Sequence, residues 1–304
     1  MTTIVCYNKT IVEDATKHIP VLLDEVLNYL APQSGESYLD LTAGYGGHAE
    51  RILEATRNYK DAVLVDRDES AVEYLRAKYR KVKPEIMHDD FYSAALRMIE
   101  SGKQFNMILA DFGVSSPQLT GGERGFSFAT DGRLDMRMDR RQTLDAWQVV
   151  NKWSERDLGE IFAKYGEERE GRAKQMAREI ARSRPIETTG ELARIIERKS
   201  GWGKRHPATQ IFQAIRMVVN DEMGQIEGVL PLVAKLLVPG GRVALISFHS
   251  LEDRLVKNYL LEASGRGVES ELKVLTKKPV VAGKNELVNN PRARSAKLRV
   301  GEKL

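Results

Sequence analysis

A glycine-rich stretch with a carboxylate before it and another after it carries the clearest chemical signal in this sequence. Asp40 ends a short apolar run and is followed by Gly44, Gly46 and Gly47, and Asp66 ends the next apolar run. Glycines let a backbone approach a ligand closely, and the start of a helix supplies oriented N–H groups. A carboxylate at the tip of the second strand can accept hydrogen bonds from ribose hydroxyls. The pattern predicts a site for a nucleoside cofactor.

Two classes of cofactor fit this loop. The spacing Gly44-x-Gly46-x-x-Ala49 also satisfies the dinucleotide fingerprint, in which the helix start binds a pyrophosphate. The acidic Asp40 favours a cationic sulfonium cofactor instead, because a carboxylate there attracts a cation and repels a pyrophosphate. Asp111 adds a further carboxylate at the end of another apolar run. A nicotinamide-dependent oxidoreductase is therefore the enzymatic alternative.

Three further segments are predicted to lie on the same rim. Phe91 follows a short strand and can stack on an adenine ring, although an aromatic at this place is also a common core residue. The segment Asp111–Gln118 follows another strand, and its carboxylate and carbonyls can polarise the N–H groups of a poorly nucleophilic amine. His249 ends a later strand and can contact a base or a phosphate, or act as a hydrogen-bonded structural residue. Ser250 and Asp253 beside it are predicted to cap the next helix.

Alternating strands and helices position these residues. Strand and helix signals of this kind predict a parallel sheet covered on both faces. The predicted strands are 38–41, 62–65, 86–88, 107–110, 242–247, 272–275 and 297–300, and the predicted helices are 21–30, 48–56, 69–79, 91–99, 207–230 and 251–262.

The alternation is interrupted in the middle of the chain. Residues 113–140 form a loop rich in Gly, Ser, Pro and Asp, and residues 143–199 carry only helical signals. The expected organisation is a first part of the catalytic domain over residues 1–124, a loop and inserted helical domain over 125–205, and a second part over 206–304.

Composition predicts a globular protein and is compatible with a polyanionic partner, although each basic cluster taken singly is equally typical of a solvated face. The chain has 304 residues, a net charge of +4 and a single cysteine, Cys6, so an internal disulfide is excluded. Basic residues concentrate in 194–206 and 292–299. No apolar run reaches the ~18 residues of a membrane helix, and the first residues lack the pattern of a secretory signal. We expect a cytoplasmic protein without a membrane partner and without a metal site.

Taken together, the motifs resemble one family, the ribosomal RNA small-subunit methyltransferase H family (RsmH, also called MraW). The resemblance spans nearly the whole chain in family order, and the strings SSPQL, RGFSF, LDMRMD and SFHSLEDR are specific to it. Two local departures are Leu41 to Tyr45 in the glycine loop and Phe112 after Asp111. The matching segments are 18–25, 44–48, 65–68, 113–119, 123–128, 131–138, 206–209, 246–254 and 290–295.

The resemblance implies an α/β, class I methyltransferase fold (Rossmann-like, mostly parallel, seven strands) with an inserted all-helical domain. It implies S-adenosylmethionine as methyl donor and the N4 of a cytidine in the decoding region of 16S rRNA as acceptor, within the 30S subunit, and it leaves a homodimer open. An RNA-binding assembly factor with a relic pocket is the non-enzymatic alternative. The cofactor residues implied are Gly44, Gly46, Gly47, His48, Asp66, Phe91, Asp111 and Gln118. The catalytic candidates are Asp111 and His249, and the substrate-binding candidates are Ser115, Ser116, Pro117, Arg124, Arg137, Arg292 and Arg294.

Overall fold

The computed structural model describes residues 19–113, 124–198, 206–265 and 270–304. The chain divides into two compact units, of which the first comprises residues 1–113 and 223–304 and the second residues 114–222. The second unit therefore extends beyond the predicted range of 125–205. The reason is packing, because side chains of 208–219 belong to the same hydrophobic core as the helices before them.

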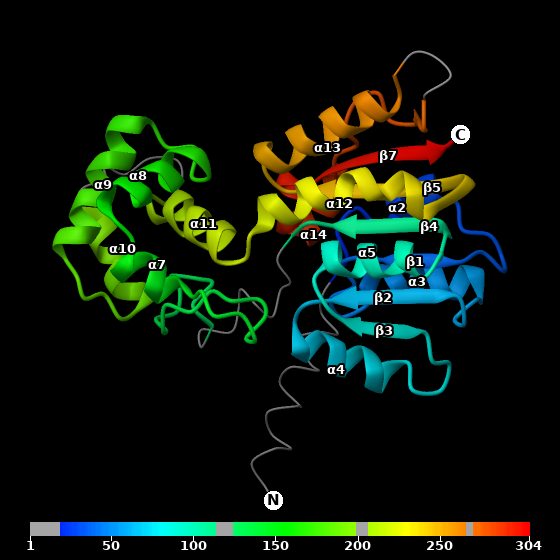
Figure 1. The fold of residues 1–304 in the computed structure, drawn as a ribbon, viewed down its shortest axis with the longest axis horizontal. Helices are drawn as coiled ribbons and strands as arrows, with labels where there is room; N and C mark the ends of the chain where they lie inside the picture. Colours follow the sequence, from blue (N-terminus) through cyan, green and yellow to red (C-terminus); the bar gives the residue numbers. More distant parts are fainter. Residues whose placement is uncertain (1–18, 114–123, 199–205, 266–269) are drawn as a thin grey trace, which may run out of the picture. The chain divides into compact units, whose positions relative to one another are not determined.

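The first unit contains a seven-stranded sheet in the order β3-β2-β1-β4-β5-β7-β6 (Figure 1). The strands β1 to β5 are parallel, and β7 runs antiparallel to its neighbours β5 and β6. This is the class I methyltransferase fold. The bounds are β1 Tyr38–Asp40, β2 Ala62–Asp66, β3 Glu85–His88, β4 Phe105–Asp111, β5 Leu237–Ser247, β6 Leu272–Val274 and β7 Lys297–Lys303.

Helices cover both faces of this sheet, as buried parallel strands require. One face packs against α5, α12 and α13, and the other against α2, α3 and α4. The bounds are α2 Leu23–Leu30, α3 Gly47–Thr56, α4 Glu69–Lys78, α5 Phe91–Glu100, α12 Glu222–Leu236, α13 Ser250–Ala263 and α14 Lys284–Asn289, followed by the 3-10 helix η2 Pro291–Ser295. Residues of α12 from Met223 onward belong to the first unit.

The second unit is helical and has a hydrophobic core of its own. A buried amide joins the segment before its helices to α11, since Asn220 accepts from the backbone N–H of Met138 at 2.8 Å and donates to the carbonyl of Met136 at 2.8 Å. The bounds are α7 Ala146–Lys152, α8 Glu155–Lys164, α9 Glu170–Arg182, α10 Thr189–Arg198 and α11 Ala208–Val219.

Three local predictions differ from the structure. The predicted helix 207–230 is two helices, because the chain turns at Asn220 and at Asp221, whose φ is +47°. Gly240 and Gly241 lie inside β5, at a register shift between β4 and β5. The stretch after β6, predicted as a loop, contains α14 and η2. None of the helices in the described ranges is both long and apolar enough to cross a membrane.

Candidate functional site

Three carboxylates lie where parallel strands end. Asp40 ends β1, Asp66 ends β2 and Asp111 ends β4, and the strand register places these three strands side by side. The carboxyl edge of a doubly wound sheet is where ligands bind in such folds. The prediction that these residues share one rim is therefore supported by the topology of the sheet.

The glycine loop between β1 and α3 is pinned to β2 by hydrogen bonds. The backbone N–H of Gly44 donates to Asp66 Oδ2 at 2.7 Å, and that of Ala43 donates to the Val65 carbonyl at 2.8 Å. Gly44 and Gly46 have φ of +53° and +75°, a region that favours glycine. A Cβ on Gly47 would lie 2.6 Å from Pro20 Cγ, so this glycine lets Pro20 pack on the start of α3.

The Asp66 carboxylate accepts hydrogen bonds from two backbone N–H groups, one of them in the glycine loop. Its Oδ1 accepts from the backbone N–H of Asp68 at 2.8 Å, while Oδ2 holds Gly44. Each carboxylate oxygen has two lone pairs, so capacity to accept a ligand hydroxyl remains. Asp68 in turn caps α4 by accepting from Ser70 at 3.1 Å.

Asp40 and Asp111 differ in how they are held. Asp40 is only 1% exposed, and it accepts from the Tyr38 hydroxyl at 2.8 Å and from the Thr42 backbone at 3.1 Å. Asp111 is half-buried, and its backbone N–H donates to Thr42 Oγ1 at 2.6 Å. Its side-chain Oδ1 has no hydrogen-bond partner among the described residues. Of these three carboxylates, Asp111 is therefore the one with an oxygen atom that accepts no hydrogen bond from a described residue.

Burial makes all three carboxylates unusually hard to ionise. It raises the pKa of Asp40 to about 7, that of Asp66 to about 6 and that of Asp111 to about 7. Hydrogen bonds from backbone N–H groups oppose this rise at each residue. The charges of Asp40 and Glu252 also raise the pKa of Asp111. A cation bound here would relieve the repulsion, whereas a pyrophosphate would increase it.

Aromatic rings surround the Asp111 turn. The Phe91 and Phe112 rings lie 5.6 Å apart, and Phe91 packs against the core as well as standing at the start of α5. A Cβ on Gly113 would lie 2.6 Å from Phe248 Cε2, so the ring of Phe248 fixes the backbone just after Asp111. Asp90 caps α5 by accepting from Ser93 at 2.8 Å.

His48 is held by a backbone interaction rather than open to a ligand. It is 8% exposed, and its Nε2 lies 2.9 Å from the Val21 carbonyl. A ring nitrogen facing a carbonyl carries the proton and donates it. His48 thus ties the start of α3 to the segment before α2, and its side chain contributes to the shape of the loop.

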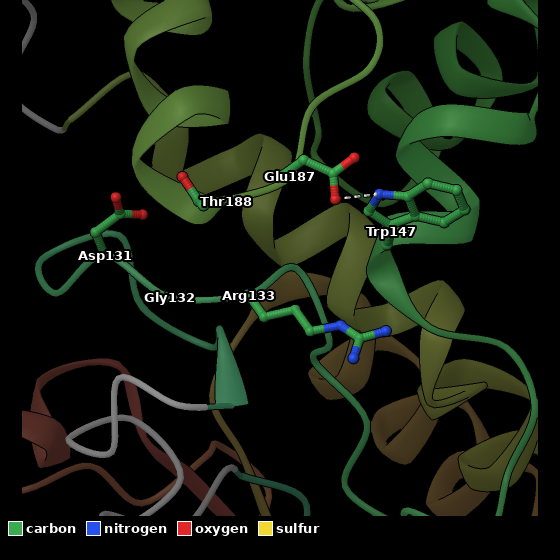
Figure 2. Close-up of a pocket in the computed structure, with 6 residues that line it drawn as sticks. All are labelled: Asp131, Gly132, Arg133, Trp147, Glu187 and Thr188. Carbon is green, nitrogen blue, oxygen red and sulfur yellow. Dashed lines mark hydrogen bonds between the residues drawn. The ribbon is translucent and has the colours of Figure 1, made fainter.

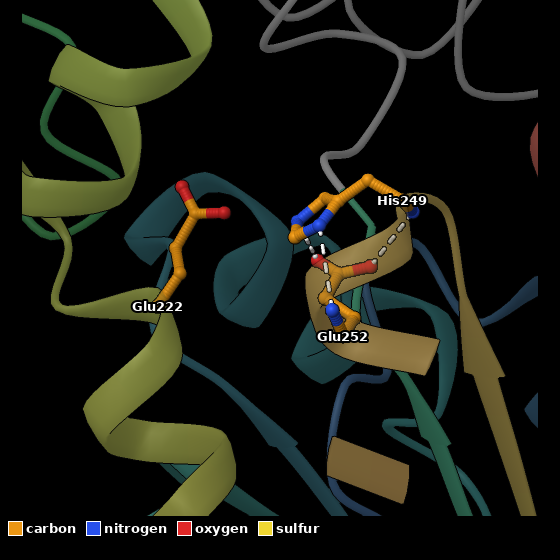
Figure 3. A group of neighbouring side chains, drawn as sticks. All are labelled: Glu222, His249 and Glu252. Carbon is orange, nitrogen blue, oxygen red and sulfur yellow. Dashed lines mark hydrogen bonds and ion pairs between the residues drawn. The ribbon is translucent and has the colours of Figure 1, made fainter. Parts of the chain in front are cut away.

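His249 is the N-cap of α13, which corrects the predicted Ser250–Asp253 pair (Figure 3). Its Nδ1 accepts from the Glu252 backbone at 3.4 Å, and its Nε2 lies 2.7 Å from Glu252 Oε1. Glu252 is 1% exposed and accepts from the backbone N–H of Phe248 at 2.7 Å. Asp253 instead contacts β7, through Lys297 at 2.9 Å and Arg299 at 2.7 Å. His249 therefore has a structural partner.

Replacing Glu252 with alanine is expected to lower the free energy of unfolding by about 2–3 kcal/mol, because buried N–H groups lose their acceptor. Glu262→Ala, an exposed site on the same helix, is the control and should change stability by less than about 0.5 kcal/mol. Urea unfolding monitored by circular dichroism measures both. Equal midpoints for the two variants would contradict the assigned role of Glu252.

The predicted RNA-binding arginines fall into two groups. Arg124 donates to the carbonyls of Arg137 and Met138 at 2.8 and 2.7 Å, and Arg137 forms an ion pair with Asp135 at 2.8 Å. Both guanidinium groups thus build the loop of the second unit. Arg294 is exposed on η2, and Arg292 is half-buried. The predicted residues Ser115, Ser116, Pro117 and Gln118 lie outside the described residues.

The second unit also has a pocket that the sequence did not reveal (Figure 2). Its volume is about 670 Å³. The Trp147 indole N–H donates to Glu187 Oε2 at 3.0 Å, and the Lys152 ammonium lies 5.2 Å from the centre of the Trp147 ring. The helical apolar pattern around Trp147 predicts a core residue. Such a pattern does not distinguish a ring buried in the core from a ring that lines a pocket, so the pocket could not be predicted from it. The lining residues are Asp131, Gly132, Arg133, Trp147, Glu187 and Thr188.

Comparison with known proteins shows the family to which the chain belongs. A ribosomal RNA small subunit methyltransferase H of Trichormus variabilis is 48% identical over 297 residues, covering 96% of this chain and 94% of the relative. The protein of the same name from Acidobacterium capsulatum is 44% identical, covering 94% and 98%. Among solved structures, an rRNA methylase of Streptococcus thermophilus covers 93% of each chain at 9% identity, with a TM-score of 0.41. The model of the MraW methylase family matches residues 15–304. The chain therefore belongs to the MraW methylase family.

Proposed function

We propose that this protein transfers a methyl group from S-adenosylmethionine to the N4 of a cytidine in the decoding region of 16S rRNA. The observation that carries the proposal is the set of three carboxylates with raised pKa values, one buried and two half-buried, around a glycine loop whose Gly44 has open space beside it. Relatives over 40% identical are named ribosomal RNA small subunit methyltransferases, which supports the substrate class.

The residues present fit this cofactor. A Cβ added to Gly44 would meet no other atom within 4 Å, so ligand atoms can lie directly against its backbone. Asp66 retains lone pairs for ribose hydroxyls, and Phe91 stands at the next strand end. Asp40 and Asp111 supply negative potential for a cation. When bound, S-adenosylmethionine supplies an electrophilic methyl group on a positively charged sulfur.

The role that the chain's own residues have toward the amine follows from its chemistry. The lone pair of a cytosine amine is delocalised into the ring, so acceptors on its N–H groups favour transfer. Asp111 Oδ1 is the candidate acceptor, because this atom is buried and has no partner among the described residues. Phe248 and Gly113 hold the turn that carries Asp111, and Glu252 holds Phe248. In this scheme His249 positions the turn rather than transferring a proton.

RNA binding is assigned to exposed groups of both units. A cytosine must leave its stack to reach a buried site, and the cost of a few kcal/mol is repaid by contacts elsewhere. Arg294, with Arg292 beside it on η2, is the candidate phosphate contact of the first unit. In the second unit the pocket brings together an indole ring and the Arg133 side chain, which is 71% exposed. The lining holds one cation, Arg133, and two carboxylates, Asp131 and Glu187, so the pocket suits a stacked base rather than a phosphate.

The proposal is tested with 30S subunits from cells that lack the protein. Incubation with S-adenosylmethionine carrying an isotopically labelled methyl group, followed by mass spectrometry of the rRNA nucleosides, should yield labelled N4-methylcytidine at one position. A label on a ring carbon or on a ribose oxygen would reject the acceptor atom. Since the substrate is ribosomal, we place the protein in the cytoplasm, and gel filtration decides between a monomer and a homodimer.

The affinity for S-adenosylmethionine is expected to rise between about pH 5.5 and pH 7.5. The pKa values of Asp40, Asp66 and Asp111 are raised to about 7, 6 and 7. A bound cation favours the ionised carboxylates, so binding releases protons, and affinity falls as the pH drops through these pKa values. Calorimetry in buffers of different ionisation enthalpy measures this release.

S-adenosylhomocysteine is the control ligand for this pH dependence, because its sulfur is neutral. Fewer protons should be released when it binds. If both ligands release the same number of protons, the carboxylates do not sense the charge on the sulfur, and their proposed electrostatic role is wrong.

A further inference from the structure

A dense group of cations lies at the edge of the sheet opposite the carboxylate site. The sequence RAKYRKVK, residues 76–83, contains five cations and no acidic residue. It comprises the last turn of α4 and the connection to β3. Because α4 runs back along the sheet after β2, this end lies at the amino edge of the strands (Figure 1).

The end of α3 lies next to the end of α4 and adds two cations. The Tyr59 and Tyr79 rings, which follow α3 and α4, have centres 6.4 Å apart. Arg57 and Lys60 flank Tyr59. We call the exposed cations of both helix ends the basic edge surface, which consists of Arg57, Lys60, Arg76, Arg80, Lys81 and Lys83.

The cations of this surface are exposed and are not used in ion pairs. None of the six takes part in an ion pair within the part of the chain that the structure describes. Lys78 differs, because it bonds Glu50 at 3.0 Å and lies 5.9 Å from the centre of the Tyr74 ring. Internal pairing therefore does not account for the six.

Helix capping does not account for the whole group either. Cations in the last turn of a helix interact favourably with its dipole, and the effect fades within that turn. Arg76 and Lys78 occupy the last turn of α4. Arg80, Lys81 and Lys83 lie beyond it, where Lys83 has a φ of +51°. Three like charges this close repel one another, and a bound polyanion would offset this repulsion.

An RNA backbone fits this surface better than a membrane. Membrane-surface helices present a broad apolar face beside their cations. Here Val82, 44% exposed, is the one large apolar side chain that is exposed between residues 57 and 83. Arginine and lysine side chains are the usual contacts to the phosphates of a nucleic acid, and such contacts do not read the base sequence.

We propose that the basic edge surface binds the phosphate backbone of the substrate rRNA, away from the base that reacts. This inference rests on the proposed function, since it assumes that rRNA is the substrate. It follows that the substrate must be large enough to reach from the carboxyl edge of the sheet to the amino edge. A short oligonucleotide would occupy only the site at the carboxyl edge and would not reach the basic edge surface.

The first test is a salt series of rRNA binding. The triple variant Arg80→Gln, Lys81→Gln, Lys83→Gln should bind a 16S rRNA fragment more weakly. Its slope of log affinity against log salt should be shallower by about 2–3, because each phosphate contact contributes about 0.7–0.9. The control variant Lys235→Gln, Lys257→Gln, Lys273→Gln removes the same charge from α12, α13 and β6 and should keep the wild-type slope.

The second test compares two substrates in the methylation assay. The triple variant should show a raised KM on 30S subunits or long rRNA, and an unchanged KM on a short oligonucleotide that carries the target cytidine. The inference is overturned if the triple variant and the control variant have the same slope of log affinity against log salt. It is also overturned if wild type and the control variant bind anionic phosphatidylserine vesicles and the triple variant does not. If the salt slopes of wild type and the triple variant differ as expected but wild type methylates no rRNA, the proposed function fails and the inference stands.

Discussion

Replacing Asp111 with asparagine is expected to slow methyl transfer about 100- to 1000-fold, the usual loss when one preorganised polar group at a reacting centre is removed. The Gly113 backbone N–H donates to the Asp111 carboxylate. The variant keeps the shape of the side chain and an oxygen for this bond, so binding of S-adenosylhomocysteine should persist. Single-turnover methylation of 30S subunits, with calorimetry for the ligand, separates the two effects. Full rates in the variant would show that other acceptors polarise the amine.

The pH profile gives this prediction a second readout. Burial raises the pKa of Asp111 to about 7, so the wild-type rate should fall below neutral pH as the carboxylate gains a proton. The variant should lack this acid limb. The folded pKa exceeds the unfolded value of about 3.9, so wild-type stability falls as the pH rises from about 4 to 7. The asparagine variant should therefore be no less stable than wild type at pH 8.

Motifs tied to strand ends were the most predictable part of this protein. The glycines after Asp40 and the carboxylates Asp66 and Asp111 sit at the expected edge, because short apolar runs fix the strands and parallel topology brings their ends together. Phe91 likewise lies at the start of α5, as expected. Each of these inferences needed only local sequence and one rule about sheets.

Roles that depend on a distant partner could not be predicted. His48 contacts the Val21 carbonyl, and Arg124 binds carbonyls near residue 137, and neither partner is marked by a spacing rule. His249 and Glu252 satisfy the capping-box spacing, yet the hydroxyl of Ser250 was a more conventional cap. The compact unit ends at residue 222 rather than at 205, because Phe212 belongs to its hydrophobic core, and a core shared between distant segments is not marked in the sequence.

Replacing Gly44 with alanine is expected to weaken binding of S-adenosylhomocysteine at least tenfold, or about 1.4 kcal/mol. Gly44 has a φ of +53°, so alanine costs about 1–2 kcal/mol of stability there. A Cβ at this position meets no protein atom within 4 Å. The methyl group would instead occupy the space that we assign to the cofactor, and calorimetry measures the lost affinity.

Gly35 provides a matched control, because it too has a positive φ, +89°, and open space around a Cβ, but lies in the exposed turn before β1. Gly35→Ala should lower the free energy of unfolding by a similar amount and leave ligand affinity unchanged. The difference between the two variants therefore isolates the contact with the cofactor from backbone strain. If both variants bind S-adenosylhomocysteine as tightly as wild type, the cofactor does not lie against Gly44, and the assignment of the glycine loop as its binding site is wrong.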